Sequence, residues 1–197
     1  LGDVYKRQVY PIEKANESKG KEDILQKVQK SKNSPAKELL DISLDAEEYT
    51  VTFVANGQTV TRKALFDWSK EDNERIRYYS GTAIYKTTFP WKYKEQKDRQ
   101  VYLHLGTVYN LATVRVNGID CGTVWTAPYR ADITAALKKG TNELEIEVTN
   151  TWANALKGTD EGKAPFEGIW TNAKYRKQEN TLLPGGLLGP LYLEQSN

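Results

Sequence analysis

The sequence is poor in the residues that build metal clusters, disulfides and catalytic triads. Its 197 residues include one cysteine, one histidine and no methionine. A single cysteine, Cys121, excludes an internal disulfide and a zinc site made of several cysteines, and we expect it to be a small buried apolar residue. A single histidine, His104, argues against a multi-histidine metal site and a Ser-His-Asp triad. It falls in an alternating segment, which predicts the outward face of a strand.

Long apolar runs and a strong excess of one charge are also missing. No segment approaches the roughly 20 apolar residues of a membrane-spanning helix. Lys and Arg total 28 against 26 Asp and Glu, and both signs are scattered along the chain. A nucleic-acid-binding protein would instead carry a basic patch or stripe. We therefore expect neither a nucleic-acid partner nor a membrane partner. Because the chain begins with Leu and lacks methionine, we interpret it as a fragment of a longer protein.

The sequence does contain many short segments in which apolar and polar residues alternate. Residues 101–106, 112–116 and 142–150 each repeat with period two, which is typical of a strand with one buried face. Asn117-Gly118 and Asn56-Gly57 each follow such a segment and predict tight hairpin turns. Roughly eight short strands separated by Gly and Pro turns predict an all-β jelly-roll β-sandwich over residues 48–197.

Two stretches lack this alternation. Residues 1–47 are mostly polar, and we expect a poorly packed tail, a linker or the remnant of an upstream domain. Residues 151–183 are polar and aromatic without a sustained period, which predicts a functional loop. Between these stretches, Asp132 or Thr134 is expected to cap one helical turn, and residues 187–194 to form the closing strand.

Several segments together resemble a known family. Gly122-Thr123-Val124-Trp125 is one of seven that occur in order; the others are residues 79–85, 103–106, 114–118, 128–134, 140–144 and 148–152. The series resembles the sugar-binding-like jelly roll of family 2 glycoside hydrolases. It is still more similar to the C-terminal β-sandwich of family 106 glycoside hydrolases, the α-L-rhamnosidase type, and residues 183–190 resemble the ending of that family.

The resemblance has consequences for fold, partners and cofactors. It implies a galactose-binding-like sandwich attached to a separate catalytic domain, in an enzyme that acts on plant or bacterial polysaccharide in the periplasm or outside the cell. Jelly rolls of this kind often carry one structural calcium ion. The sequence contains no recognisable acid-rich loop that would bind it, and we expect no other cofactor.

Acidic residues are plentiful, but their pattern does not indicate catalysis. Glycoside hydrolysis usually needs two carboxyl groups that flank the scissile bond. Glu143, Glu145 and Glu147 alternate on the outer face of a strand, where solvation explains them. Asp160 and Glu161 lie in the long predicted loop, and nothing in their spacing demands a pair. We therefore expect no glycosidase turnover from this chain alone.

Aromatic residues in loops indicate a binding surface instead. We predict that Trp125, Tyr129, Arg130, Trp152 and Asn154 converge at one end of the sandwich, because their loops leave neighbouring strands. Aromatic rings offer flat apolar faces to a pyranose, while Arg and Asn pair with hydroxyl groups. The alternatives are an ion pair for Arg130 and Arg115, and packing under the long loop for the tryptophans, above all for Trp170.

Two functions from different classes follow. The first is a non-catalytic, carbohydrate-associated β-sandwich domain of an α-L-rhamnosidase-like glycoside hydrolase. The second is a structural or interaction sandwich that braces the catalytic domain without binding sugar itself. Exposed loop aromatics would favour the first function, and covered ones the second.

Overall fold

The computed structural model describes residues 39–44, 46–92, 99–172 and 181–196. These residues belong to one compact unit, Glu38–Asn197. The predicted tail comprises residues 1–47, and its first 38 residues, with their expected loose packing, lie outside the described residues. The part of the chain that the structure describes contains no helix long and apolar enough to cross a membrane.

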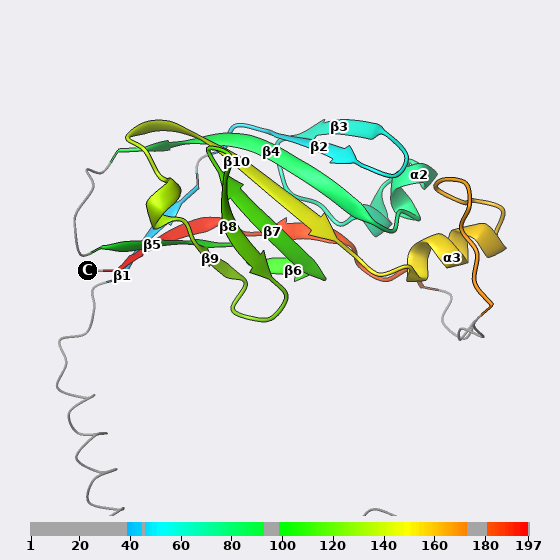
Figure 1. Ribbon diagram of the computed structural model, residues 1–197. Coiled ribbons are helices and arrows are strands. Elements are labelled where there is room, and N and C mark those ends of the chain that lie inside the picture. Colours follow the sequence, from blue (N-terminus) through cyan, green and yellow to red (C-terminus); the bar gives the residue numbers. More distant parts are fainter. Residues whose placement is uncertain (1–38, 45, 93–98, 173–180, 197) are drawn as a thin grey trace, which may run out of the picture. The chain divides into compact units, whose positions relative to one another are not determined.

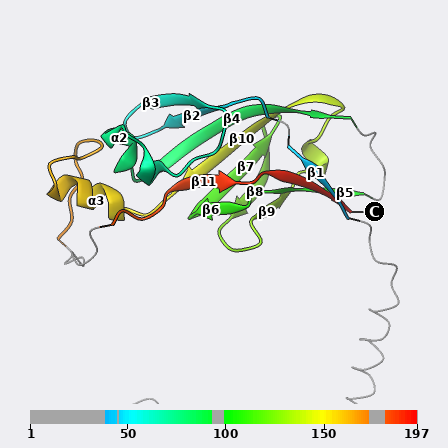
Figure 2. The same ribbon diagram turned by 180° about the vertical axis from the view of Figure 1, so that it is seen from behind.

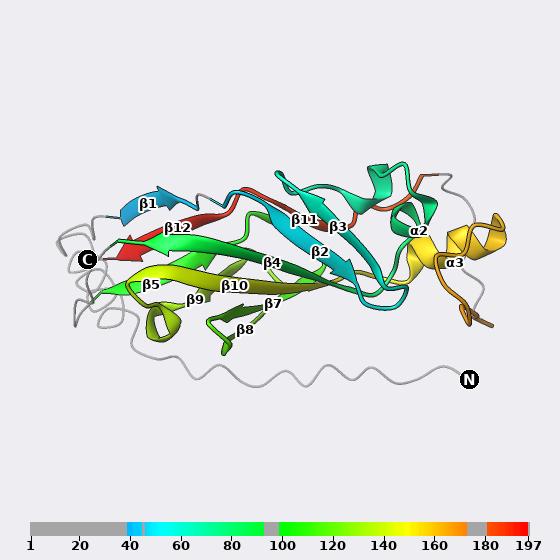
Figure 3. The ribbon, with the colours of Figure 1, turned by 90° about the horizontal axis from the view of Figure 1, so that it is seen from above.

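The larger of two facing sheets has six strands, and Figure 3 shows them side by side from above. Every neighbouring pair in it runs antiparallel. The long strands in its middle, β4 and β10, pair residue by residue over ten positions. In spatial order the strands are β3 (Gln58–Arg62), β2 (Tyr49–Phe53), β4 (Thr82–Trp91), β10 (Gly140–Thr149), β7 (Leu111–Val116) and β8 (Ile119–Val124).

The second sheet has four antiparallel strands and lies below the first in Figure 1. A separate two-stranded ribbon continues it, with β11 (Gly186–Gly189) paired to β6 (Thr107–Tyr109), as Figure 2 shows. The all-β antiparallel sandwich predicted from alternation is therefore confirmed. In spatial order the four strands are β1 (Leu39–Ser43), β12 (Tyr192–Ser196), β5 (Gln100–His104) and β9 (Arg130–Asp132).

The described residues also include four short helical segments: η1 (Trp68–Lys70), α2 (Glu74–Arg77), η2 (Thr134–Ala136) and α3 (Ala153–Asp160). The turn predicted near Thr134 is present as η2, and Asp132 Oδ1 accepts a hydrogen bond from the Thr134 N–H at 3.0 Å. Helix α3 was expected to be loop. Its N-cap, Trp152, makes no side-chain capping bond, so the usual sequence signal for a helix start is missing. Helices α2 and α3 lie at the same end of the sandwich (Figure 1).

Several turns form where the sequence has a glycine, because glycine adopts positive φ without strain. Asn117 and Gly118, between β7 and β8, both have positive φ, 52° and 79°, as the predicted tight turn requires. The β2–β3 connection is longer than predicted, and of Asn56-Gly57 only Gly57 has positive φ. Gly106 also needs its missing side chain, because a Cβ there would lie 2.1 Å from the Gly189 carbonyl oxygen.

Aromatic side chains fill the core near the α3 end. The rings of Phe53, Trp68 and Tyr79 meet edge to face, with centroids 4.9–5.7 Å apart. Trp68 is fully buried, and its indole Nε1–H donates to Tyr85 Oη at 2.7 Å. The Leu187 N–H donates to the same oxygen at 3.2 Å, and burial raises the pKa of Tyr85 well above its ordinary value. This core anchors both β4 and the β11 ribbon under the α3 end.

Two element boundaries differ from the sequence expectation. Strand β1 precedes residue 48, where the sandwich was expected to begin, and it pairs with β12 from end to end. The predicted closing strand at residues 187–194 is divided into β11 and β12 around Pro190. Proline has no N–H to donate to a neighbouring strand, which explains the interruption.

Candidate functional site

The β8–β9 connection carries two of the five predicted site residues, Trp125 and Tyr129, and Arg130 follows as the first residue of β9. Trp125 is 69% exposed, so its ring is available to a partner. Tyr129 is half-buried against the core, and its carbonyl accepts a hydrogen bond from the Leu105 N–H at 2.8 Å. The connection therefore presents one free aromatic ring, and its second ring serves mainly as packing.

Arg130, at the start of β9, belongs to a cluster on the outer face of the four-stranded sheet. Its Nη1 lies 3.4 Å from Glu194 Oε1, and its guanidinium lies 4.5 Å from the centre of the Tyr102 ring. His104 Nε2 lies 2.6 Å from Glu194 Oε2, and the imidazole stacks on Tyr192. Arg130 thus forms the ion pair that was its alternative interpretation. His104 does lie on the face away from the core, but its neighbours cover it, leaving 9% exposed.

The other two predicted residues lie at the start of α3, with Trp152 as its N-cap and Asn154 in its first turn. Trp152 is 57% exposed, and its ring meets the edge of Phe166 at 6.1 Å. Asn154 is only 3% exposed. Its Nδ2–H donates to the Leu183 carbonyl at 2.7 Å, and its Oδ1 accepts from the Leu183 N–H at 2.9 Å. Asn154 therefore fixes the returning chain beside α3, and its amide is already occupied.

The predicted residues form two groups. Both loops leave the six-stranded sheet at the same end, as expected, because Ala112 pairs with Val124 on one side and Val148 on the other. Beyond that point the β8–β9 connection turns towards the four-stranded sheet, whereas the other segment enters α3, and the two lie apart in all three ribbon views (Figures 1, 2 and 3). No hydrogen bond, ion pair or ring contact between described residues joins the groups. Their sugar contacts stay predictions.

A groove of about 700 Å³ opens beside α3, and we call it the end groove. The sequence had marked Asn56 only as a turn residue. Its Nδ2–H donates to the carbonyls of Arg75 and Pro165, at 2.8 and 3.3 Å. This amide ties the β2–β3 loop to α2 and to the loop after α3. The groove is lined by Ala55, Asn56, Arg75, Thr159, Ala164, Pro165, Phe166, Glu167, Gly168 and Ile169.

One signal for the end groove was present in the sequence. The predicted functional loop at residues 151–183 supplies much of the lining, although nothing in the sequence joined it to Asn56 and Arg75. Trp170, next to the lining residue Ile169, is 79% exposed. The expectation that Trp170 packs under the loop is therefore wrong, because no described side chain covers it enough to bury it.

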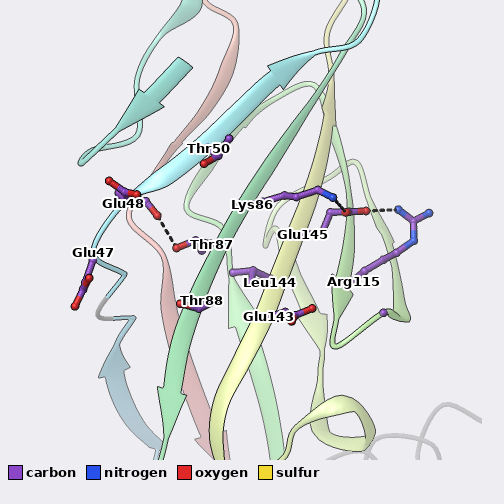
Figure 4. A pocket seen from close by; sticks show the side chains of 11 residues that line it. Glu47, Glu48, Thr50, Lys86, Thr87, Thr88, Arg115, Glu143, Leu144 and Glu145 are labelled. Atoms are coloured by element: carbon purple, nitrogen blue, oxygen red, sulfur yellow. Dashed lines mark hydrogen bonds and ion pairs between the residues drawn. The ribbon is translucent and has the colours of Figure 1, made fainter. Parts of the chain in front are cut away.

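A second groove, of about 500 Å³, runs over the outer face of the six-stranded sheet (Figure 4), and we call it the sheet groove. Lys86 Nζ lies 3.0 Å from Glu145 Oε2, and Arg115 Nη1 lies 3.2 Å from Glu145 Oε1. Arg115 also pairs with Glu147. The ion pair that was the alternative interpretation of Arg115 is therefore present, and the glutamates lie on the outer face as predicted.

Electrostatics in this groove keep the Glu145 carboxylate ionised. The pKa of Glu145 lies below its ordinary value, first because Lys86 hydrogen-bonds to it and then through the charge of Lys86 and the hydrogen bond from Arg115. Near α3, the pKa of Glu161 is lowered by hydrogen bonds from Lys157 and Tyr78. A glycosidase general acid needs the opposite, a raised pKa. Neither carboxylate is suited to donate a proton near neutral pH.

The remaining polar groups give no sign of redox or metal chemistry in the residues that the structure describes. No three or more His, Cys, Asp and Glu side chains there gather closely enough to hold a metal ion. Cys121 is half-buried at the edge strand β8, and burial raises the pKa of its thiol. Whether the chain binds the structural calcium ion that such jelly rolls often carry is untested.

The chain is similar to domains of known glycoside hydrolases. Residues 58–182 match the model of the family described as "Glycosyl hydrolase 2 galactose-binding domain-like". A protein of Formosa agariphila, provisionally named a beta-glucuronidase, is 36% identical over 174 residues, which cover 74% of this chain and 15% of that protein.

Two solved structures of glycoside hydrolases also match this chain. A rhamnosidase from a Novosphingobium species matches with a TM-score of 0.75 and 33% identity, over 83% of this chain and 16% of that one. An FMN-binding beta-glucuronidase from Facaelibacterium prausnitzii matches with a TM-score of 0.54 and 25% identity, over 81% of this chain and 23% of that one. The chain thus spans less than a quarter of the length of each of these relatives.

Proposed function

Because the chain belongs to the glycosyl hydrolase 2 galactose-binding domain-like family, we propose that it is a non-catalytic, carbohydrate-associated domain of a larger glycoside hydrolase. In this proposal the parent enzyme is rhamnosidase-like, acts on plant or bacterial polysaccharide, and works in the periplasm or outside the cell. The 33% identity with the Novosphingobium rhamnosidase supports the choice of enzyme. The partners of the domain are carbohydrate and the catalytic domain of its own chain.

The observation that carries the proposal is the exposure of three tryptophans on loops. Trp125, Trp152 and Trp170 are 69%, 57% and 79% exposed. An exposed indole offers a flat apolar face to a partner, and a pyranose presents a matching apolar face. Two of the three lie beside the end groove, in contact with or next to its lining residues.

The charge pattern supports a non-catalytic role. The described carboxylates with shifted pKa, Glu145 and Glu161, are both held as anions by neighbouring cations. In a larger enzyme the carboxyl pair would then come from another domain, and this domain would contribute to one wall of a shared cleft.

A bracing role is the second candidate, and two observations favour it. Asn154 and Arg130, both predicted to contact sugar, are instead engaged by Leu183 and Glu194 within the domain. If the domain only braces its catalytic partner, the exposed tryptophans are the surface that the partner covers. The two roles therefore differ in whether free sugar reaches these rings.

An NMR titration of the chain with rhamnose-containing oligosaccharides tests the proposal. We expect indole N–H signals to shift with a dissociation constant near 1 mM, roughly −4 kcal/mol, because few rings and no enclosing partner contribute. The same titration on Trp125→Ala and Trp152→Ala identifies which ring binds. Indole signals that stay still, or shift equally in both variants, would make bracing the better account.

A further inference from the structure

The end groove contains two charged side chains of opposite sign that no described residue neutralises. Arg75 and Glu167 both line the groove and are exposed. The guanidinium of Arg75 donates one long hydrogen bond, 3.3 Å, to the Asn56 carbonyl. Neither side chain forms an ion pair with a described residue. Both therefore keep hydrogen-bonding capacity for a ligand.

Their neighbours behave differently. Arg77 Nη2 lies 3.6 Å from Asp72, Lys163 Nζ lies 2.9 Å from Glu74 Oε1, and Lys157 Nζ lies 2.8 Å from Glu161 Oε1. Ion pairing is thus common around α2 and α3. Arg75 and Glu167, on the surface that faces the groove, differ from these neighbours because neither forms an ion pair with a described residue.

The walls of the groove are held in place before any ligand arrives. The loop after α3 is fixed where the Lys163 N–H donates to the Gly158 carbonyl at 2.6 Å, and again where Asn56 binds Pro165. The Phe166 ring packs edge-on against Tyr79 of the core, with centroids 5.9 Å apart. Pre-formed concave sites with an apolar wall and a few polar groups are typical of small-molecule binding.

We propose that the end groove is the sugar-binding site of this domain, and that it takes a neutral pyranose with two adjacent hydroxyl groups. A hydroxyl group both donates and accepts, so Glu167 can accept from one hydroxyl while Arg75 donates to its neighbour. The opposite charges of Arg75 and Glu167 give no net attraction for an acidic sugar. Phe166, with Trp152 at its edge, supplies the apolar surface. This assignment rests on the proposed carbohydrate-binding function and moves its site away from the β8–β9 connection.

The test is a titration of the full chain, followed by NMR, with methyl α-L-rhamnopyranoside and, in parallel, methyl β-D-glucuronide. The rhamnoside is expected to shift the Gly168 amide and the Trp152 indole, while the Trp125 indole stays still. Arg75→Gln and Glu167→Gln should each weaken binding about tenfold, since each removes a charged hydrogen-bonding partner. The backbone carbonyl of Arg75 that binds Asn56 is retained in the first variant. Lys139→Gln, at the opposite end of β10, removes an exposed charge as a control and should leave binding unchanged.

Three other results would each contradict a specific part of this proposal. If the rhamnoside shifts Trp125 and leaves Gly168 unmoved, the end-groove assignment is wrong and the proposed function stands. If the glucuronide binds tighter and only Arg75→Gln weakens it, the site selects an acidic sugar and the neutral class is wrong. If neither probe nor the rhamnose-containing oligosaccharides shift any signal, both the assignment and the proposed function fail.

Discussion

The end groove and the sheet groove are both lined by charged residues, but they use those charges differently. In the sheet groove both cations, Lys86 and Arg115, are paired with glutamates of β10. In the end groove the cation, Arg75, has no carboxylate partner among the described residues. Groups that already satisfy one another must be separated before a ligand can use them, which costs free energy, whereas unpaired groups are ready to bind. Concavity alone therefore does not identify the site, and the pairing of the lining charges separates the two grooves.

The two grooves also rest on different supports. The sheet groove lies on regular strands, where the ladder between β4 and β10 fixes the backbone. The end groove is built from loops and short helices, so side-chain amides must fix it. Asn56, Asn150 and Asn154 each bind backbone groups of a distant segment there. Substitutions in these supports should harm the end groove and spare the sheet groove.

The largest effect is expected from Asn154→Ala. It removes both hydrogen bonds between the buried Asn154 amide and the backbone of Leu183, and each is worth about 0.5–1.5 kcal/mol. Urea unfolding should show a lower midpoint with little change in slope. Asn172→Ala, an exposed asparagine in the following loop, should change stability by less than about 0.5 kcal/mol. Equal stabilities of the two variants would mean that Leu183 is held by something other than Asn154.

Gly158→Ala should come next, with a loss of about 1–3 kcal/mol from overpacking. Alanine normally favours a helix over glycine, so a stabilised variant would be expected from helix propensity alone. Here a Cβ would lie 2.8 Å from the Lys163 carbonyl oxygen and 2.9 Å from Tyr78 Cβ. Thermal unfolding distinguishes the two expectations, with Thr159→Ala on the same helix as the control. A higher midpoint for Gly158→Ala would show that α3 and its following loop are loosely associated.

The smallest effect concerns the sheet groove and pH. The folded-state pKa of Glu145 is lowered, so its contribution to stability is fully present above the unfolded-state pKa of about 4.3. That contribution is lost as pH falls through the lower, folded-state pKa. Wild type should therefore lose more stability than Glu145→Gln between pH 5 and pH 3, approximately, and about equally between pH 8 and pH 6. Parallel acid profiles for the two proteins would contradict the Lys86–Glu145–Arg115 network.

The strands could be predicted from the sequence because alternation is a local property. Along β10, glutamates alternate with the apolar residues Leu144, Ile146 and Val148. The pair Asn117-Gly118 favours a tight turn by itself, because both residues readily adopt positive φ. Helix α3 was missed because Trp152 supplies no capping bond, and its stability comes from tertiary contacts such as the Ala155 N–H bound to Ser80 Oγ.

The site was harder to predict because it depends on residues far apart in the chain. Asn56 binds Arg75 and Pro165, and no periodicity connects these three positions. Trp125 and Trp152 are exposed, as a binding surface requires, and their contact with sugar stays a prediction. Whether Asn154 and Arg130 are engaged within the domain could be seen only in three dimensions.

The central claim, that pairing of the charges separates a binding groove from a non-binding one, can be measured within a single spectrum. Arginine side-chain Nε–Hε signals report on Arg75 and Arg115 at once during a titration with methyl α-L-rhamnopyranoside. We predict that the Arg75 signal moves as the probe saturates its site and that the Arg115 signal does not. Movement of Arg115 with Arg75 unchanged would contradict the account and assign binding to the sheet groove.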